Sequence, residues 1–406
     1  MRYTIFVTIF LCAVCVHSLA AQDGFVSLFN GTDLTGWSVK GGDAKYSVDD
    51  GCIVGTVNDT RRNTFLCSEK EYENFIFKAE FKFDQDFNSG IQFRSKARPE
   101  GDRERVYSYQ YEMASGGMTG AVYDEGRRAR WLNVVTDELT AKTQTAFRKG
   151  EWNLAEIQCV GPSIRTWLNG ELISDFYDVE TAVGFFGLQV HAANQPGQIR
   201  WRNIQVKELP STPWKPFFKD GQFVDLEVKP AGKWEFLADG SVYATSTRDE
   251  RQDGMLLSKE VFDNFAVRVT FKRGLGNSGM YFRAHEINAA HWVCGFQCEI
   301  DEGSPSAGLW EVGGGPSKGR GWVFKPSEEN AQNYRPEWND IATIAVGDRI
   351  VTILNGKQVV DMIDPDCLKN GKTALQLHGG SNMEYWFRNY EIMPLSKEMV
   401  DYLITR

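Results

Sequence analysis

The sequence has little histidine, no run of basic residues, and no long hydrophobic stretch after its first 21 residues. No later window is apolar enough to cross a bilayer. The formal net charge is -9, which argues against a nucleic-acid-binding surface. Helical periodicity is weak except in residues 396–404, whereas 39 Gly and 12 Trp fit strands and turns. These absences favour a strand-rich protein whose ligand is not a nucleic acid.

The first residues resemble a targeting segment. Arg2 supplies a positive charge, residues 5–16 are apolar, and small residues follow at 18–21. This order is typical of a secretory signal, and the apolar stretch is too short for a membrane span. Leu11 and Val14, rather than small residues, precede Cys12 and Cys15, so a lipid anchor is less favoured. We therefore expect a signal peptide at 1–21 and a periplasmic or extracellular protein.

Cysteine is sparse in the chain that would remain. Six cysteines are left after residue 21, and no CxxC pair occurs among them. An exported context permits disulfides. The sequence makes Cys52 with Cys67 the most plausible bridge, and buried free thiols are the alternative.

A repeat organises the rest of the chain. The Asn-Ser-Gly strand at 88–94 recurs at 277–283, and further landmarks return in the same order. The other matched segments are 110–112 with 297–299, 151–153 with 337–339, 168–170 with 354–356, 188–191 with 375–378, and 202–203 with 388–389. The order indicates a tandem duplication. We expect one unit at 22–208 and a second at 217–406, joined by a stiff linker at 209–216 that holds three prolines.

Each unit is predicted to be all-β. In each copy an Asn-Gly pair, at 169–170 and at 355–356, separates two alternating apolar runs. Asn-Gly between such runs is a strong signal for a type I′ hairpin. Many short strands with frequent turn signals favour a two-sheet sandwich of the jelly-roll type.

Three strands of the first unit carry polar residues at positions i and i+2, which share one face of a strand. The pairs are Gln92 and Arg94, Gln110 and Glu112, and Gln189 and His191. If the three strands are neighbours, they line a groove with a cation, a carboxylate and an imidazole. The corresponding residues of the second unit are Arg283, Gln297, Glu299 and His378.

Each of these residues also has a structural interpretation. Arg94 and Glu112 could form an ion pair that only stabilises the groove, and His191 could be a hydrogen-bonded structural group. Asn88 and Asn277 are expected to shape turns, next to glycines that allow close backbone packing. The Glu-Trp-Asn and Asn-Gly segments and residues 202–203 are expected to be folding elements.

The chain resembles the 3-keto-disaccharide hydrolase domain family, in two copies that cover nearly all of it. The matching segments are 29–37, 88–94, 151–153, 168–170, 189–191 and 202–204. The resemblance implies two tandem concanavalin-like jelly-roll β-sandwiches. The second copy lacks the Asn-Gly-Thr-Asp-Leu opening and differs from the first at 310–315, so we favour the first unit as the active one.

The resemblance also implies a chemistry. A glycoside oxidised at C3 has an acidic proton on C2; its removal gives an enolate that expels the C1 aglycone, and water then adds. Our hypothesis assigns His191 as base, Arg94 as enolate stabiliser, and Glu112 as acid or as the group that orients the imidazole. The residues expected to bind substrate are Gln92, Gln110, Gln189, Tyr123, Asp124 and Arg127.

The resemblance does not firmly imply any cofactor, and Glu112 and His191 are compatible with a divalent metal. Ordinary two-carboxylate hydrolysis is less supported, because Glu112 has no acidic partner on the matching face. The expected partner is an oxidised di- or oligosaccharide or glycoside. The alternatives are a lectin-like carbohydrate-binding protein without catalysis and a structural or adhesion module.

Overall fold

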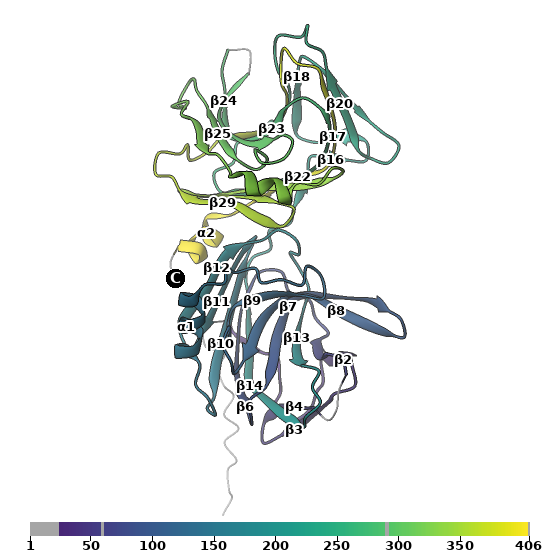
Figure 1. The fold of residues 1–406 in the computed structure, drawn as a ribbon, viewed down its shortest axis with the longest axis vertical. Helices are drawn as coiled ribbons and strands as arrows, with labels where there is room; N and C mark the ends of the chain where they lie inside the picture. Colours follow the sequence, from purple (N-terminus) through teal and green to yellow (C-terminus); the bar gives the residue numbers. More distant parts are fainter. Residues whose placement is uncertain (1–23, 58–60, 289–291, 405–406) are drawn as a thin grey trace, which may run out of the picture.

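The computed structural model describes residues 24–57, 61–288 and 292–404, which form two β-sandwiches stacked on each other (Figure 1). The expected signal peptide at 1–21 lies outside the described residues. Each sandwich has a larger sheet, here the back sheet, and a smaller one, the front sheet. The prediction of two tandem all-β sandwiches is confirmed.

In the first unit, the last strand pairs beside the early strands. The back sheet runs in the order β12 (Glu171–Tyr177), β11 (Ser163–Leu168), β10 (Asn153–Val160), β6 (Phe75–Phe83), β14 (Gly197–Glu208), β4 (Cys52–Val57) and β3 (Lys45–Asp49), with β1 (Val26–Ser27) beside β14. The front sheet runs β2 (Trp37–Gly41), β5 (Thr64–Ser68), β13 (Phe185–Val190), β7 (Asn88–Glu100), β8 (Arg103–Ala114) and β9 (Val122–Glu125).

The second unit repeats this order. Its back sheet runs β19 (Lys233–Phe236), β20 (Val242–Ser246), β31 (Met383–Pro394), β22 (Phe265–Leu275), β27 (Asn339–Val346), β28 (Arg349–Leu354) and β29 (Lys357–Ile363), with β15 (Lys215–Pro216) beside β31. Its front sheet runs β18 (Leu226–Lys229), β21 (Gly254–Ser258), β30 (Lys372–Leu377), β23 (Ser278–Glu286), β24 (Val293–Ile300), β25 (Leu309–Val312) and β26 (Gly321–Phe324). A small hairpin joins β16 (Phe218–Lys219) and β17 (Gln222–Phe223).

Strand alternation explains both cores. Along β6, Phe75, Phe77 and Phe81 are buried between the sheets, while the intervening Lys78 and Glu80 are half-buried on the other face. Large aromatic side chains carry much of this burial, which is the main favourable term in folding. The Asn-Gly turns behave as predicted: Asn169 and Gly170 have φ of 52° and 90°, the left-handed values that a type I′ turn needs.

Within the described ranges, two α-helices and a 3₁₀-helix accompany the sheets. Helix α2 (Lys397–Ile404) confirms the expectation for the C-terminal residues, while η2 (Glu328–Asn333) is a short 3₁₀ element. Helix α1 (Asp137–Ala146) was not expected, because it is only weakly amphipathic. It begins at Thr136, whose side chain accepts a hydrogen bond from the Leu139 amide.

The two units are packed together rather than loosely tethered. Alternate residues of β27 and β28, such as Ile344 and Val351, face away from their own core and join an apolar cluster with Val160 of the first unit and Met399 of α2. An ion pair between Arg349 and Asp175 joins the units at 2.9 Å. The outer face of the second unit's back sheet is thus covered by the first unit (Figure 1).

Both ends of the expected linker at 209–216 are held by the units. The linker backbone is held on the first unit, where the Asn74 side chain donates to the Pro210 carbonyl, and β15 already belongs to the second unit.

All six described cysteines are buried free thiols, so the expected Cys52–Cys67 bridge is absent. No helix in the described ranges is long and apolar enough to cross a membrane.

Candidate functional site

The arginine of the Asn-Ser-Gly strand does not reach the predicted groove. The β7–β8 register shifts between Phe93 and Lys96, and Arg94 there has a φ of 46°. This bulge breaks the strict alternation that placed Arg94 on the face of Gln92. The expectation that Arg94 lies beside Glu112, as catalyst or as ion-pair partner, is therefore wrong.

Arg94 instead ties distant backbone segments together. Its guanidinium is 1% exposed, and it donates to the carbonyls of Glu73 and Gly161, both at 2.8 Å, and to Asn74 Oδ1 at 3.1 Å. Arg283 repeats the φ of 46° and donates to the Asp263 carbonyl at 3.1 Å. Both arginines thus have a structural position away from the front-sheet face.

Four other side chains form a hydrogen-bonded row across β7 and β8. Gln92 Nε2 donates to Gln110 Oε1 at 3.0 Å, and Gln110 Nε2 donates to Glu112 Oε2 at 3.0 Å. Asn88 Nδ2 completes the row, donating to Glu112 Oε1 at 2.6 Å. The structure thus brings together three predicted residues and adds Asn88, which the sequence suggested only as a turn residue.

Glu112 is the charged end of this row. The side chain is 7% exposed, and this burial raises the pKa of the carboxyl, although the hydrogen bonds from Gln110 and Asn88 partly oppose the shift. The nearby charge of Glu125 raises it further. A raised pKa favours the protonated form of a buried carboxyl, which can give its proton to a ligand oxygen.

Gln189 and His191 lie on the neighbouring strand or directly after it. The register pairs Leu188 with Ile91, so Gln189 comes opposite Gly90, which itself pairs with Glu112. Gln189 is fully buried, and neither atom of its amide has a partner among the described residues. A buried polar group in this state calls for a ligand or an ordered water.

The tautomer of His191 follows from its contact. Its Nδ1 lies 2.8 Å from the Ala192 carbonyl oxygen, which can only accept. Nδ1 therefore carries the proton, and Nε2 is left with a lone pair. A ring nitrogen in this state can act as a base toward a bound ligand.

A cavity of about 480 Å³ lies on the first unit, and none of Gln92, Gln110, Glu112, Gln189 and His191 lines it. Its lining includes Asn63, Phe65, Arg105, Glu125 and Ala192. Phe65 is the strand partner of Gln189, and Asn63 accepts a hydrogen bond from the amide of Ala192 at 3.0 Å. The cavity thus lies against the Gln189–His191 segment, with Glu125 close enough to act on the Glu112 carboxyl.

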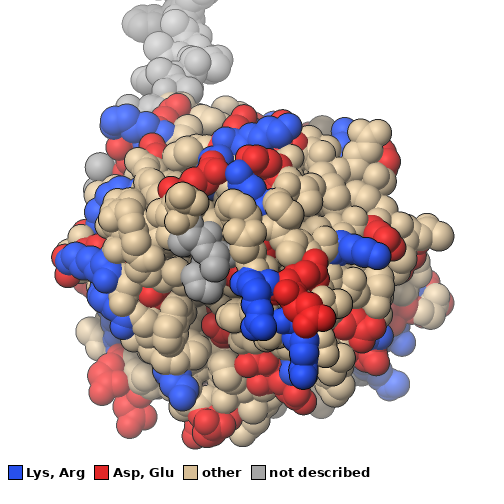
Figure 2. All heavy atoms as spheres, turned by 90° about the horizontal axis from the view of Figure 1, so that it is seen from above, with Lys and Arg blue, Asp and Glu red and all other residues tan. Residues whose placement is uncertain are grey.

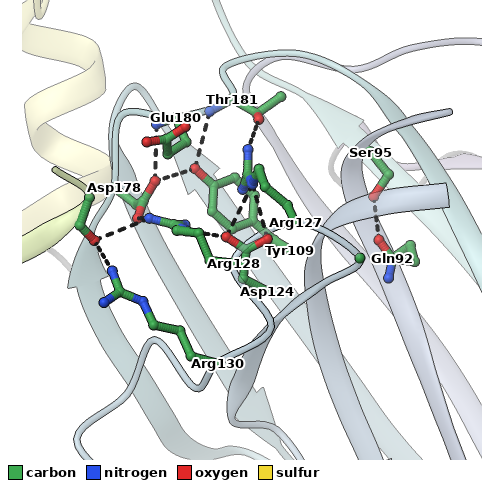
Figure 3. Close-up of polar contacts among 12 residues, drawn as sticks. Gln92, Ser95, Tyr109, Asp124, Arg127, Arg128, Arg130, Asp178, Glu180 and Thr181 are labelled. Carbon is green, nitrogen blue, oxygen red and sulfur yellow. Dashed lines mark hydrogen bonds and ion pairs between the residues drawn. The ribbon is translucent and has the colours of Figure 1, made fainter. Parts of the chain in front are cut away.

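Two predicted binding residues belong to a different cluster (Figure 3). Asp124 is fully buried and is paired with Arg127 at 3.0 Å and with Arg128, which also reaches Asp178 at 2.7 Å. In Figure 3 these side chains point to one another, apart from Gln92 and its partner Ser95. The expectation that Asp124 and Arg127 bind substrate is therefore wrong.

The partners of this cluster explain its position. Arg127 also donates to Thr181, and Arg128 and Arg130 donate to the Gly356 carbonyl of the second unit. The segment thus fastens the first unit to the second. Tyr123, in contrast, pairs with Gln110 across β8 and β9, and its ring meets Trp131 edge-on at 5.2 Å.

In the second unit the equivalent residues surround a cavity of about 540 Å³. Glu299 and His378 line this one cavity, together with Asn277, Gln297, Gln376, Trp310 and Trp322. The convergence of carboxylate, amides and imidazole that the sequence predicted is present here, without Arg283. The repeated arrangement makes the front-sheet face the candidate site of both units.

Glu299 repeats the chemistry of Glu112. Its carboxyl accepts hydrogen bonds from Asn277 and from Gln297, the latter at 3.2 Å. Burial, with a smaller contribution from Asp301, raises its pKa to about 7.

The second unit differs in two neighbours. Tyr281 replaces Gln92, and Asp253 replaces Asn63 and accepts a hydrogen bond from Gln376 Nε2 at 2.6 Å. The Gly379 amide also donates to Asp253, as the Ala192 amide does to Asn63.

Neither site assembles a recognisable metal centre from the described residues. No group of three or more His, Cys, Asp or Glu side chains among them is placed to hold a metal ion. The surface around the second unit is mixed in sign: Figure 2 views this end of the molecule and shows Lys and Arg interspersed with Asp and Glu.

The comparisons with known proteins agree with this architecture. The family described as 3-keto-alpha-glucoside-1,2-lyase-like domain matches residues 24–207 and again residues 213–393. A 3-keto-disaccharide hydrolase of Bacteroides thetaiotaomicron is 24% identical over 234 residues, which covers 46% of this chain and 79% of that protein.

Two solved structures each match a part of this chain about as long as one unit. A Parabacteroides distasonis protein described as a glycosyl hydrolase is 21% identical, with a TM-score of 0.33, over 46% of this chain and 94% of its own. A Bacillus subtilis protein with a galectin-like fold is 13% identical, with a TM-score of 0.34, over 45% of this chain and 94% of its own.

Proposed function

Because the chain belongs to the family of 3-keto-alpha-glucoside-1,2-lyase-like domains, we propose that its first unit cleaves glycosides oxidised at C3. The observation that carries this proposal is the buried, unpartnered amide of Gln189, between the raised-pKa carboxyl of Glu112 and the imidazole of His191. Family membership supports a glycosidase-type activity on carbohydrate, and these three groups supply the acid, base and donor that the reaction needs.

The proposed reaction begins with proton removal. The Nε2 lone pair of His191 takes the proton from C2 of the sugar, and the electrons of that C–H bond form a C2=C3 enolate. Gln189 Nε2 donates a hydrogen bond to the developing O3 oxyanion, a role first assigned to Arg94. A buried, preoriented donor of this kind stabilises charge as it forms.

Elimination and hydration complete the cycle. The enolate returns its electrons to form a C1=C2 double bond, and the C1–O bond breaks with its electron pair on the leaving oxygen. Glu112 gives its proton to that oxygen, which leaves as the free alcohol. Water then adds across the double bond: its hydroxyl bonds to C1, its other proton goes to Glu112, and His191 returns its proton to C2, so that both residues regain their starting states and the net result is hydrolysis. Export through the 1–21 segment, consistent with a sugar outside the cell, is part of the same proposal.

Single substitutions in matched positions test this assignment. We expect His191→Ala and Glu112→Gln each to lower kcat for a 3-keto-glucoside by about 10²–10⁴-fold. Gln189→Ala should lower it by about 10²–10³-fold. The matched second-unit variants His378→Ala and Glu299→Gln serve as controls. Full turnover by His191→Ala, or binding of the 3-keto-glucoside without any turnover by the unaltered protein, would contradict the proposal.

A further inference from the structure

The front sheets of the two units differ just before the matched parts of β8 and β24. Arg105 and Trp292 occupy equivalent positions, each directly before the matched valines Val106 and Val293 of β8 and β24. In the first unit Arg105 lines the cavity and pairs with Glu125 at 3.4 Å. Trp292, at the matching place, has a larger and less polar side chain.

Trp292 occupies the region that is open in the first unit. Its Nε1 donates to the carbonyls of Pro230 at 2.9 Å and of Asp253 at 2.8 Å, and Asp253 is the counterpart of the cavity residue Asn63. The ring packs with Met255 and Leu257 of β21 and with Tyr281 of β23. A ligand in the second unit therefore cannot follow the path that the first unit offers.

The second cavity opens instead toward β25 and β26. There Trp310 and Trp322 meet edge-on, with ring centroids 5.3 Å apart and an interplanar angle of 85°. Lys325 Nζ lies 5.9 Å from the Trp322 ring centroid, at the same edge. Trp322 lies on β26, the seventh strand of this front sheet, which pairs with β25. The first-unit counterpart of Trp322 is Trp131, which is joined to Tyr123 only by an isolated bridge.

Glycines form a further part of this cavity's wall. Gly313, Gly319 and Gly321 all line the cavity, and a Cβ on Gly319 would lie 2.6 Å from the Cα of Gly313. The two arms of the β25–β26 loop therefore meet through backbone alone, and bulkier residues could not close it in this way. The wall leaves the aromatic edge accessible.

Two buried polar side chains lie at the inner end of the second cavity. Gln376 is 1% exposed, and its Oε1 has no partner among the described residues, although its Nε2 is held by Asp253. Glu299 is 6% exposed and lines the same cavity. An aromatic edge with a few fixed acceptors beyond it suits a molecule with one apolar face and several hydroxyl groups.

We propose that the second unit carries a saccharide-binding site of its own, which holds a pyranose ring against Trp322 and Trp310 and directs the rest of the sugar toward β26. The first unit directs its ligand the other way, into the cavity beside Arg105. The two units thus select different glycosides, and Trp292, Trp310 and Trp322 determine the difference. The ligand class rests on the proposed function, but the existence of a second site does not depend on turnover.

Calorimetric binding to the full chain tests this inference. The probe is a plain glucose disaccharide and, separately, its 3-keto form, added to the His191→Ala/His378→Ala protein so that turnover does not interfere. We expect two binding events per chain. Trp322→Ala should weaken one of them by at least about fivefold, because an aromatic contact is lost, and Trp322→Phe should restore most of the affinity. The matched first-unit variant Trp131→Ala should leave that event unchanged.

A position swap gives an independent measurement. Arg105→Trp should fill the first cavity and remove the other binding event, while the event sensitive to Trp322 persists. A single binding event insensitive to Trp322→Ala, or loss of both events in Arg105→Trp protein whose near-ultraviolet circular dichroism is native, would overturn the inference. Absence of turnover in the unaltered protein would contradict the proposed function while leaving this result intact.

Discussion

Gly90 lies directly beneath the side chain of Gln110: a Cβ at Gly90 would be 2.5 Å from Gln110 Cδ. The second unit has the same relationship, with Gly279 and Gln297 also at 2.5 Å. Each glutamine lies across a glycine and donates to the buried glutamate of its row. The glycine of the repeated Asn-Ser-Gly motif therefore positions the amide that holds the candidate acid.

Gly90→Ala should displace Gln110 and deprive Glu112 of a donor. Overpacking of this kind costs roughly 1–3 kcal/mol of unfolding free energy. We also expect kcat for the 3-keto-glucoside to fall more than KM rises, because the acid is misplaced. Gly116→Ala is the control, since a Cβ there meets nothing within 4 Å. Equal behaviour of the two variants in urea unfolding and kinetics would contradict this role.

Arg94→Met should destabilise the first unit without a specific effect on chemistry. The change leaves two buried carbonyl oxygens and the Asn74 side chain without a charged donor, which costs about 3 kcal/mol. Urea unfolding measures this loss, and Lys96→Met, at an exposed ion pair, should change stability by less than about 1 kcal/mol. A stable Arg94→Met protein that has lost turnover would return Arg94 to the catalytic site.

Glu299 gives the protein a pH-dependent stability. Its pKa is raised from 4.5 to about 7 in the folded protein. As pH rises through 4.5 the unfolded chain releases this proton first, so the unfolding free energy falls until the folded carboxyl ionises near pH 7. Below pH 4.5 the group contributes no difference.

Glu299→Gln should therefore gain stability relative to the unaltered protein between pH 5 and pH 8, by up to roughly 3 kcal/mol. Urea unfolding at the two pH values measures the difference. Asp301→Asn is the control, since it should reproduce only the small part of the effect that comes from the charge beside Glu299. A pH-independent difference between Glu299→Gln and the unaltered protein would show that the carboxyl ionises normally.

Met399 is a fully buried residue of the cluster between the two units. Met399→Ala should cost about 2–5 kcal/mol and, by loosening the contact between the units, broaden or split the thermal transition. Lys397→Ala, whose side chain is 88% exposed, is the matched change on the same helix and should have little effect. Differential scanning calorimetry separates the two outcomes, and a single sharp transition at unchanged temperature in Met399→Ala would rule out this role.

Local sequence patterns predicted the fold well because strands and turns are determined by residues close together in the chain. The Asn-Gly turns and each landmark segment of the repeat depend on neighbours within a few residues. The row of Gln92, Gln110 and Glu112 was also accessible, since β7 and β8 are adjacent in the chain and pair directly.

The site's errors arose where distant contacts decide the geometry. Arg94 lies in a β-bulge, where it donates hydrogen bonds to Glu73, Asn74 and Gly161. A strict two-residue alternation of side chains cannot predict a bulge of this kind. Asp124 is held by Arg127 and Arg128, and Arg128 also binds Asp178, fifty positions further along the chain. Asn88 was not predicted as a site residue because the sequence indicated only a role in a turn. Its position two residues before Gly90, the strand partner of Glu112, could have predicted the contact with Glu112.

The packing of the second unit's back sheet on the first unit has a consequence for ligand traffic. Because that sheet is covered, the second unit's front sheet faces away from the first, and no described residue lines both cavities. A small product released by one unit must diffuse through solvent before it reaches the other. Only a chain long enough to span both units would gain from the tether, through a higher effective concentration at the second contact.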